Sequence, residues 1–123
     1  MIHIDFLGLN YENREELIDS LNYLINQNAN FHQVKLSQKG YDKRFKELIG
    51  ELSRKNPVVI LIDEYDKPTI DVVEKTEIAL ENRKILRTFY STIKGADEFI
   101  KFAFITGVSK FSRVSVFSGL NNL

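Results

Sequence analysis

Two adjacent carboxylates, Asp63 and Glu64, directly follow the most apolar run of the chain, Val58 to Ile62. A carboxylate in such a place can hold the hydration shell of Mg²⁺, which prefers oxygen ligands and keeps several waters. A second carboxylate beside it can orient or deprotonate a water for attack on a terminal phosphate. This pattern is typical of a Walker B strand. A strand that simply ends in a solvated acidic loop gives the same short pattern, so both interpretations stay open here.

A second polar residue, Thr106, ends another apolar segment, Phe99 to Ile105. In nucleotide hydrolases with a Walker B strand, the neighbouring strand carries a polar sensor that contacts the γ-phosphate or the attacking water. Thr106 is a candidate for that sensor. Alternatively, Thr106 ends the strand and begins a turn with Gly107, and the sequence favours neither interpretation.

The elements that must position these residues alternate between strand and helix. Apolar residues recur at strand or helix spacing between turn signals, and Asn13 with Glu16 resembles a helix-capping pair. The Asn-rich stretch 26–30 and Asn56-Pro57 are predicted to end the first two helices. The predicted strands span 2–7, about 57–63 and about 100–106, and the predicted helices follow Asn13, begin near Asp42, and begin after a loop that ends near Thr76.

This order predicts an α/β fold with about three parallel strands and right-handed crossovers. Because the run Val58–Ile62 is apolar on both faces, the central strand is expected to be covered by helices on each side. Ligands of such sheets bind at the carboxyl ends of the strands. Three segments are predicted to meet at that edge, namely 8–10, 63–66 and 106–110.

Composition narrows the class of protein. The chain has 123 residues, which suits one domain, and no cysteine, which excludes disulfides, thiolate zinc sites and a thiol nucleophile. Its formal net charge of zero argues against a nucleic-acid or membrane-surface binder. There is no apolar run of membrane-spanning length and no secretory signal, so a cytoplasmic location is expected. His3 and His32 lack metal-ligand spacing and are predicted to be structural or exposed.

Three segments stand out together, namely Val58 to Pro68, Lys101 to Ser109, and the tail Ser115-Val-Phe-Ser-Gly-Leu-Asn-Asn-Leu123. Together they resemble the predicted AAA-ATPase family of anaerobic bacteria. The family carries V-x-L-I-D-E-Y-D-x-P, a strand ending T-G-V, and S-I-F-S-G-L-N-N-L. The resemblance implies a partial P-loop NTPase-type three-layer sandwich. It also implies that Asp63 is the magnesium-linked acid acting through water, Glu64 the catalytic acid/base, and Thr106 the sensor.

One family element is missing from the sequence. A P-loop, G-x-x-x-x-G-K-[ST], cradles phosphates with backbone N–H groups and a lysine, and none of the six glycines precedes Lys-Ser or Lys-Thr. We therefore expect residues 1–123 to be a single partial ATPase-like domain, an internal piece by design, by a split gene or by a truncated gene prediction. ATP and Mg²⁺ are expected for the intact parent, whereas this chain alone is expected to bind neither tightly and to be inactive.

Other functions stay open. A non-catalytic interaction module derived from an ATPase-like fold would bind a partner, or a second copy, through the strand edge at 99–106 that a missing P-loop strand would leave open. A metal-dependent nuclease has no convincing D…E-x-K arrangement. Lys110 and Arg113 are predicted to be solvated surface residues, with phosphate contact as the alternative.

Overall fold

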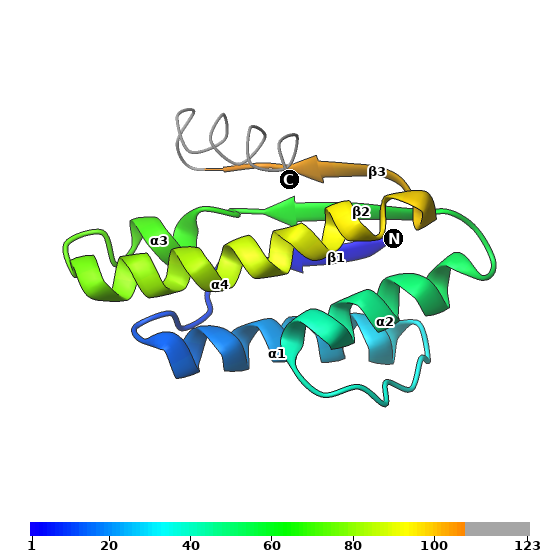
Figure 1. Ribbon diagram of the computed structural model, residues 1–123, viewed down its shortest axis with the longest axis horizontal. Coiled ribbons are helices and arrows are strands. Elements are labelled where there is room, and N and C mark those ends of the chain that lie inside the picture. Colours follow the sequence, from blue (N-terminus) through cyan, green and yellow to red (C-terminus); the bar gives the residue numbers. More distant parts are fainter. Residues whose placement is uncertain (108–123) are drawn as a thin grey trace.

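The computed structural model describes residues 1–107 and has an α/β fold (Figure 1). Strands alternate with helices as the hydrophobic pattern predicts, which confirms the fold class. The elements in chain order are β1 (Ile2–Asp5), α1 (Arg14–Phe31), α2 (Tyr41–Ser53), β2 (Val58–Asp63), α3 (Lys67–Ile70), α4 (Thr76–Gly95), the 3₁₀ turn η1 (Asp97–Phe99) and β3 (Ile100–Ile105).

The three strands form one parallel sheet in the order β1-β2-β3. In this register Asp5 lies beside Asp63, and Ile62 lies beside Ile105. The carboxyl ends of all three strands therefore meet at one edge of the sheet. This is the edge where the sequence places its candidate residues.

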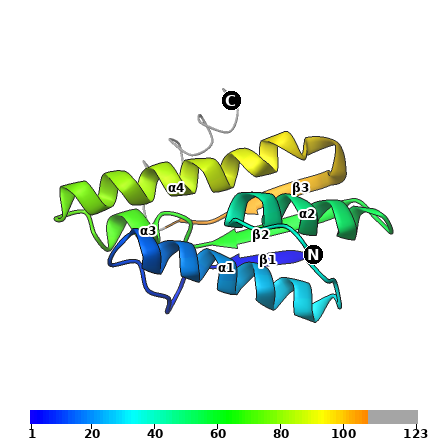
Figure 2. The same cartoon turned by 60° about the horizontal axis from the view of Figure 1, so that its bottom comes forward.

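Helices α1, α2 and α4 pack on one another and cover one face of the sheet (Figures 1 and 2). Alternate residues of β1 and β2, such as Ile4 and Ile60, are fully buried beneath them. The helices meet one another through stacked rings, with the centroids of Phe45 and Phe89 4.3 Å apart. This packing makes the helix-covered face the main hydrophobic core. No helix in the described part of the chain is long and apolar enough to cross a membrane.

The opposite face of the sheet differs from the expectation of helices on both sides. Val59 and Leu61 are only partly buried, and Phe102 and Phe104 of β3 are 53% and 58% exposed. Among residues 1–107 this face has no covering helix layer, because α1, α2 and α4 all lie over the other one. We call this surface, formed by Val59, Leu61, Phe102 and Phe104, the open face.

Helix α1 begins as predicted and ends later. The Asn13 side chain accepts a hydrogen bond from the Glu16 N–H at 2.9 Å, and the Glu16 carboxylate accepts one from the Glu12 N–H, one residue before the cap. The Asn-rich stretch, predicted to end the helix, instead continues it to Phe31. The reason is that Asn28 turns inward and is buried, where its amide has backbone partners.

Candidate functional site

The edge of the sheet brings Asp63 and Thr106 into direct contact. The Thr106 hydroxyl donates a hydrogen bond to Oδ1 of Asp63 at 2.9 Å and accepts one from the Glu64 N–H at 3.3 Å. Two further backbone bonds close the turn, from Thr106 N–H to the Ile62 carbonyl and from Tyr65 N–H to the Thr106 carbonyl. The three residues singled out by sequence thus form one hydrogen-bonded unit at the ends of β2 and β3.

The backbone turns sharply away from the direction of β2 at Glu64. Its φ is +58°, in the left-handed region that non-glycine residues rarely adopt. This conformation costs of order 1–3 kcal/mol and persists only when surrounding contacts impose it. Here the hydrogen bonds of Thr106 to the turn impose it. Strain of this kind is found often at functional sites.

The loop that follows Glu64 is held in place by hydrogen bonds from buried side chains of α4. The Tyr90 hydroxyl, on α4, donates to the carbonyl of Tyr65 at 2.9 Å. The Asn82 amide, also on α4, donates to the carbonyls of Pro68 and Tyr11. Asn82 is fully buried. Helix α4 therefore holds the loop between β2 and α3 in one position.

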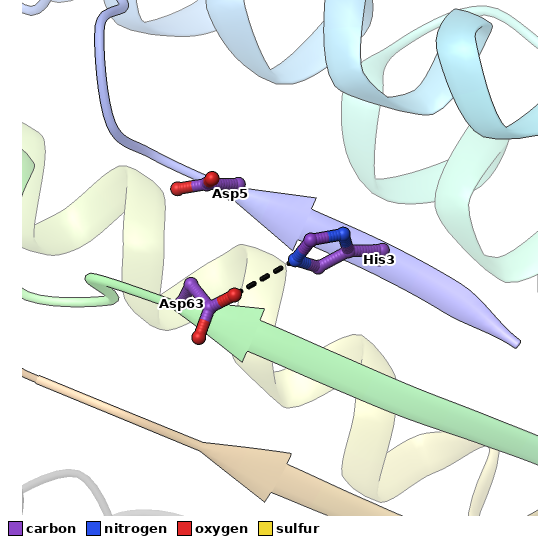
Figure 3. Close-up of side chains that lie close together, drawn as sticks. All are labelled: His3, Asp5 and Asp63. Atoms are coloured by element: carbon purple, nitrogen blue, oxygen red, sulfur yellow. Dashed lines mark hydrogen bonds and ion pairs between the residues drawn. The ribbon is translucent and has the colours of Figure 1, made fainter.

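A third strand contributes two side chains that the sequence analysis did not assign to the site. Nε2 of His3 lies 2.8 Å from Oδ2 of Asp63. Figure 3 shows these two side chains pointing toward each other. Asp5 is the register partner of Asp63, so its carboxylate lies on the same face of the sheet. Ligand atoms of His3, Asp5 and Asp63 all lie within 4.8 Å of one another. We call these three residues the His-Asp-Asp cluster.

The prediction that His3 is structural or exposed is confirmed, since its side chain is 45% exposed, but the prediction did not include the contact with Asp63. Spacing along the chain was the wrong criterion, because the partner of His3 lies 60 residues away and is brought near by strand register. One signal was available: His3 and Asp5 alternate with Ile2 and Ile4 on a predicted strand, so both point to the face opposite the core.

The backbone of His3 is held by an α1 side chain. Oδ1 of Asn28 accepts from the His3 N–H at 2.9 Å, and Nδ2 of Asn28 donates to the His3 carbonyl at 2.8 Å. Nδ2 also donates to the carbonyl of Leu24 within α1. Because β1 is the outer strand of the described sheet, these bonds replace the ladder that a fourth strand would supply. They fix the position of His3 relative to α1.

Electrostatics at the site favour an ionised Asp63. The hydrogen bond from His3 lowers the pKa of Asp63 most, and the hydrogen bond from Thr106 lowers it further, whereas partial burial opposes both. Nearby, burial raises the pKa of the Tyr11 phenol well above its ordinary value, and the negative charges of Asp71, Asp5 and Glu64 add to this. Asp63 is thus an anion in a neighbourhood rich in carboxylates.

These groups suit a divalent cation. Asp63 and Asp5 offer carboxylate oxygens and His3 offers a ring nitrogen at the carboxyl edge of a parallel sheet. Lys110, Arg113 and the tail motif at 115–123 lie outside the described residues.

Comparison with known proteins places the chain in a family. The model of a family described as "Predicted AAA-ATPase" matches residues 1–117. A protein of Azotobacter chroococcum mcd 1, described as "Uncharacterized protein in vnfD 5'region", is 41% identical over 125 aligned residues. That alignment covers all of this chain and 24% of the relative's length. No solved structure matches. The chain belongs to the predicted AAA-ATPase family.

Proposed function

We propose that Asp63, Glu64 and Thr106 are the Walker B and sensor residues of a magnesium-dependent ATP-hydrolysing site. The observation that carries this is the hydrogen-bonded unit in which Thr106, from one strand, contacts Asp63, from the next, at the carboxyl edge of the sheet. Family membership supports nucleotide use by the parent protein.

Each residue has a distinct role in this proposal. Asp63, kept ionised by its hydrogen bonds, would hold waters of a Mg²⁺ ion, and the ion would supply charge stabilisation for the phosphates. Glu64, turned out of the strand by its positive φ, would orient or deprotonate the attacking water. Thr106 positions Asp63 and would act as the sensor toward the γ-phosphate.

The phosphate-binding loop is not encoded in residues 1–123, since no glycine precedes Lys-Ser or Lys-Thr. In this proposal the chain alone does not turn over ATP, and the site becomes active where these residues are joined to such a loop. Magnesium, ATP and a cytoplasmic setting belong to that complete protein.

The decisive experiment replaces Glu64 by Gln in a protein that joins these residues to a phosphate-binding loop. Turnover should fall by about a hundredfold or more, the usual effect of losing a general base, while Mg·ATP binding stays largely intact. Glu74→Gln, a change of the same type at an exposed position, is the matched control and should leave turnover unchanged. If Glu64→Gln turns over ATP at the unaltered rate, the role proposed for Glu64 is wrong.

A second candidate function is a non-catalytic interaction module, which the exposure of Phe102 and Phe104 favours. Thermal unfolding of the loop-bearing protein with and without Mg·ATP separates the two, because a ligand of the folded state raises the midpoint. A raised midpoint supports the nucleotide site. An unchanged midpoint, with a partner whose binding is lost on changing Phe104, supports the module.

A further inference from the structure

We propose that the His-Asp-Asp cluster is a binding site for a first-row transition-metal ion, and that it takes this ion directly and without nucleotide. The proposal shares Asp63 with the proposed function. It stands on three side chains of β1 and β2, however, and not on ATP hydrolysis.

The geometry is close to that of an ion-binding site. The three ligand atoms lie within 4.8 Å of one another. Neighbouring ligands on one ion with bonds of about 2.1 Å lie roughly 3–3.5 Å apart. Nε2 of His3 and Oδ2 of Asp63, now 2.8 Å apart, would open slightly and the wider pairs would close, which would bring all three onto one ion with open positions left for water.

Each carboxylate of the cluster already accepts a hydrogen bond on one oxygen, and the strand position of His3 is fixed through its backbone. Thr106 binds Oδ1 of Asp63, while Oδ2 faces His3. The Leu7 N–H donates to Oδ1 of Asp5 at 2.9 Å. Asn28 fixes the backbone of His3. Hydrogen bonds of this kind, which orient metal ligands from behind, are a regular feature of metal sites.

The charge of the cluster calls for a cation. Within residues 1–107, no Lys or Arg forms an ion pair with Asp5 or Asp63. The His3 and Asp63 side chains are 45% and 34% exposed, so an ion can reach them from solvent. Asp5 and Asp63 are register partners on neighbouring strands, so both carboxylates lie on one face of the sheet, and Figure 3 shows the imidazole of His3 pointing to Asp63. A bound divalent ion would remove their mutual repulsion.

The imidazole selects the kind of ion. Mg²⁺ prefers an all-oxygen shell, whereas nitrogen ligands suit zinc, cobalt, nickel and related ions. For His3 to bind through Nε2, the hydrogen bond to Asp63 breaks, and any proton on Nε2 leaves to solvent or is replaced by one on Nδ1. No oxidant, reductant or other reactant is needed.

The test titrates the 123-residue chain with CoCl₂ and, separately, MgCl₂ in the absence of nucleotide. Calorimetry gives the affinity and the visible Co²⁺ spectrum gives the ligand set. One Co²⁺ per chain should bind about tenfold or more tightly than Mg²⁺. His3→Gln, which keeps a hydrogen-bond donor beside Asp63, should weaken Co²⁺ by about tenfold or more and change Mg²⁺ little, and Asp5→Asn should also weaken Co²⁺.

His32→Gln is the matched control, because His32 is a second histidine whose ring contacts the Met1 carbonyl away from the cluster. It should leave Co²⁺ binding unchanged. Equal affinity for the two ions, or unchanged Co²⁺ binding in His3→Gln, overturns the proposal, since the cluster is then a surface ion pair only. Co²⁺ binding that is lost in His3→Gln but unchanged in Asp5→Asn also overturns it, because it indicates chelation by the chain's amino terminus. The hydrolysis proposal fails separately, through Glu64→Gln, a residue outside the cluster.

Discussion

The left-handed backbone at Glu64 can be tested without any nucleotide. Glycine adopts φ near +58° at little cost, whereas a side chain costs roughly 1–2 kcal/mol there. We expect Glu64→Gly to raise the free energy of unfolding by about 0.5–1 kcal/mol in urea titrations. Gln33→Gly, at the other non-glycine residue with positive φ in the described chain, has φ +57° and is the matched control. It should give a similar gain.

A loss of stability in Glu64→Gly alone would show that the Glu64 side chain makes contacts that outweigh the backbone strain. A gain in both variants would show that the fold tolerates Glu64 only at a cost. A similar gain at Gln33 would show that this cost belongs to the left-handed backbone and not to the role of the residue. The measurement therefore separates the structural contribution of Glu64 from its proposed catalytic one.

The residues of the site were predictable from sequence to different degrees. Asp63 and Thr106 each end a strongly apolar strand, so a parallel sheet must bring them to one edge. His3 and Asp5 follow no such rule, because their approach to Asp63 depends on the exact pairing of β1 with β2. A shift of the register by one residue would point both side chains into the core. Local pattern does not determine that register.

At the scale of elements, Asn28 joins α1 to the outer edge of β1. Its amide makes three hydrogen bonds while buried, two of them to the backbone of His3. We expect Asn28→Ala to lower the free energy of unfolding by about 1–3 kcal/mol, because it leaves two partly buried backbone groups of His3 without their partner. It should also speed hydrogen exchange at the His3 amide. Urea titration and exchange measured by NMR are the two readouts.

Asn30→Ala is the control, since Asn30 is exposed on the same helix and should change stability by no more than about 0.5 kcal/mol. Equal effects of the two variants would show that Asn28 does not join α1 to β1 in the way described.

Asn28 also explains why the end of α1 was predicted too early. A cluster of asparagines favours a helix end by competing for backbone hydrogen bonds, but at Asn28 the partner is a neighbouring strand. Such tertiary contacts are not visible in the local sequence.

At the scale of the whole molecule, the two faces of the sheet have different characters. One face forms the core with α1, α2 and α4, whereas the open face carries exposed aromatic side chains next to the partly buried Val59 and Leu61. The continuous apolar run of β2 predicted that helices cover both faces of the sheet. Within residues 1–107, helices cover only one face. Because β3 is also the last strand of the described sheet, an apolar surface adjoins an unpaired strand edge.

This arrangement predicts that the chain associates with itself through β3 and the open face. The apparent mass in sedimentation velocity should rise with concentration, and Phe104→Lys should weaken association by roughly tenfold to a hundredfold, the equivalent of burying one Phe side chain. Phe31→Lys is the control, because Phe31 is 82% exposed but lies at the end of α1. Its variant should associate like the parent chain. If Phe31→Lys and Phe104→Lys weaken association equally, contact is non-specific. Association is expected because pairing at a free strand edge would remove exposed aromatic area from water. If the parent chain stays monomeric at every concentration, the open face does not drive assembly.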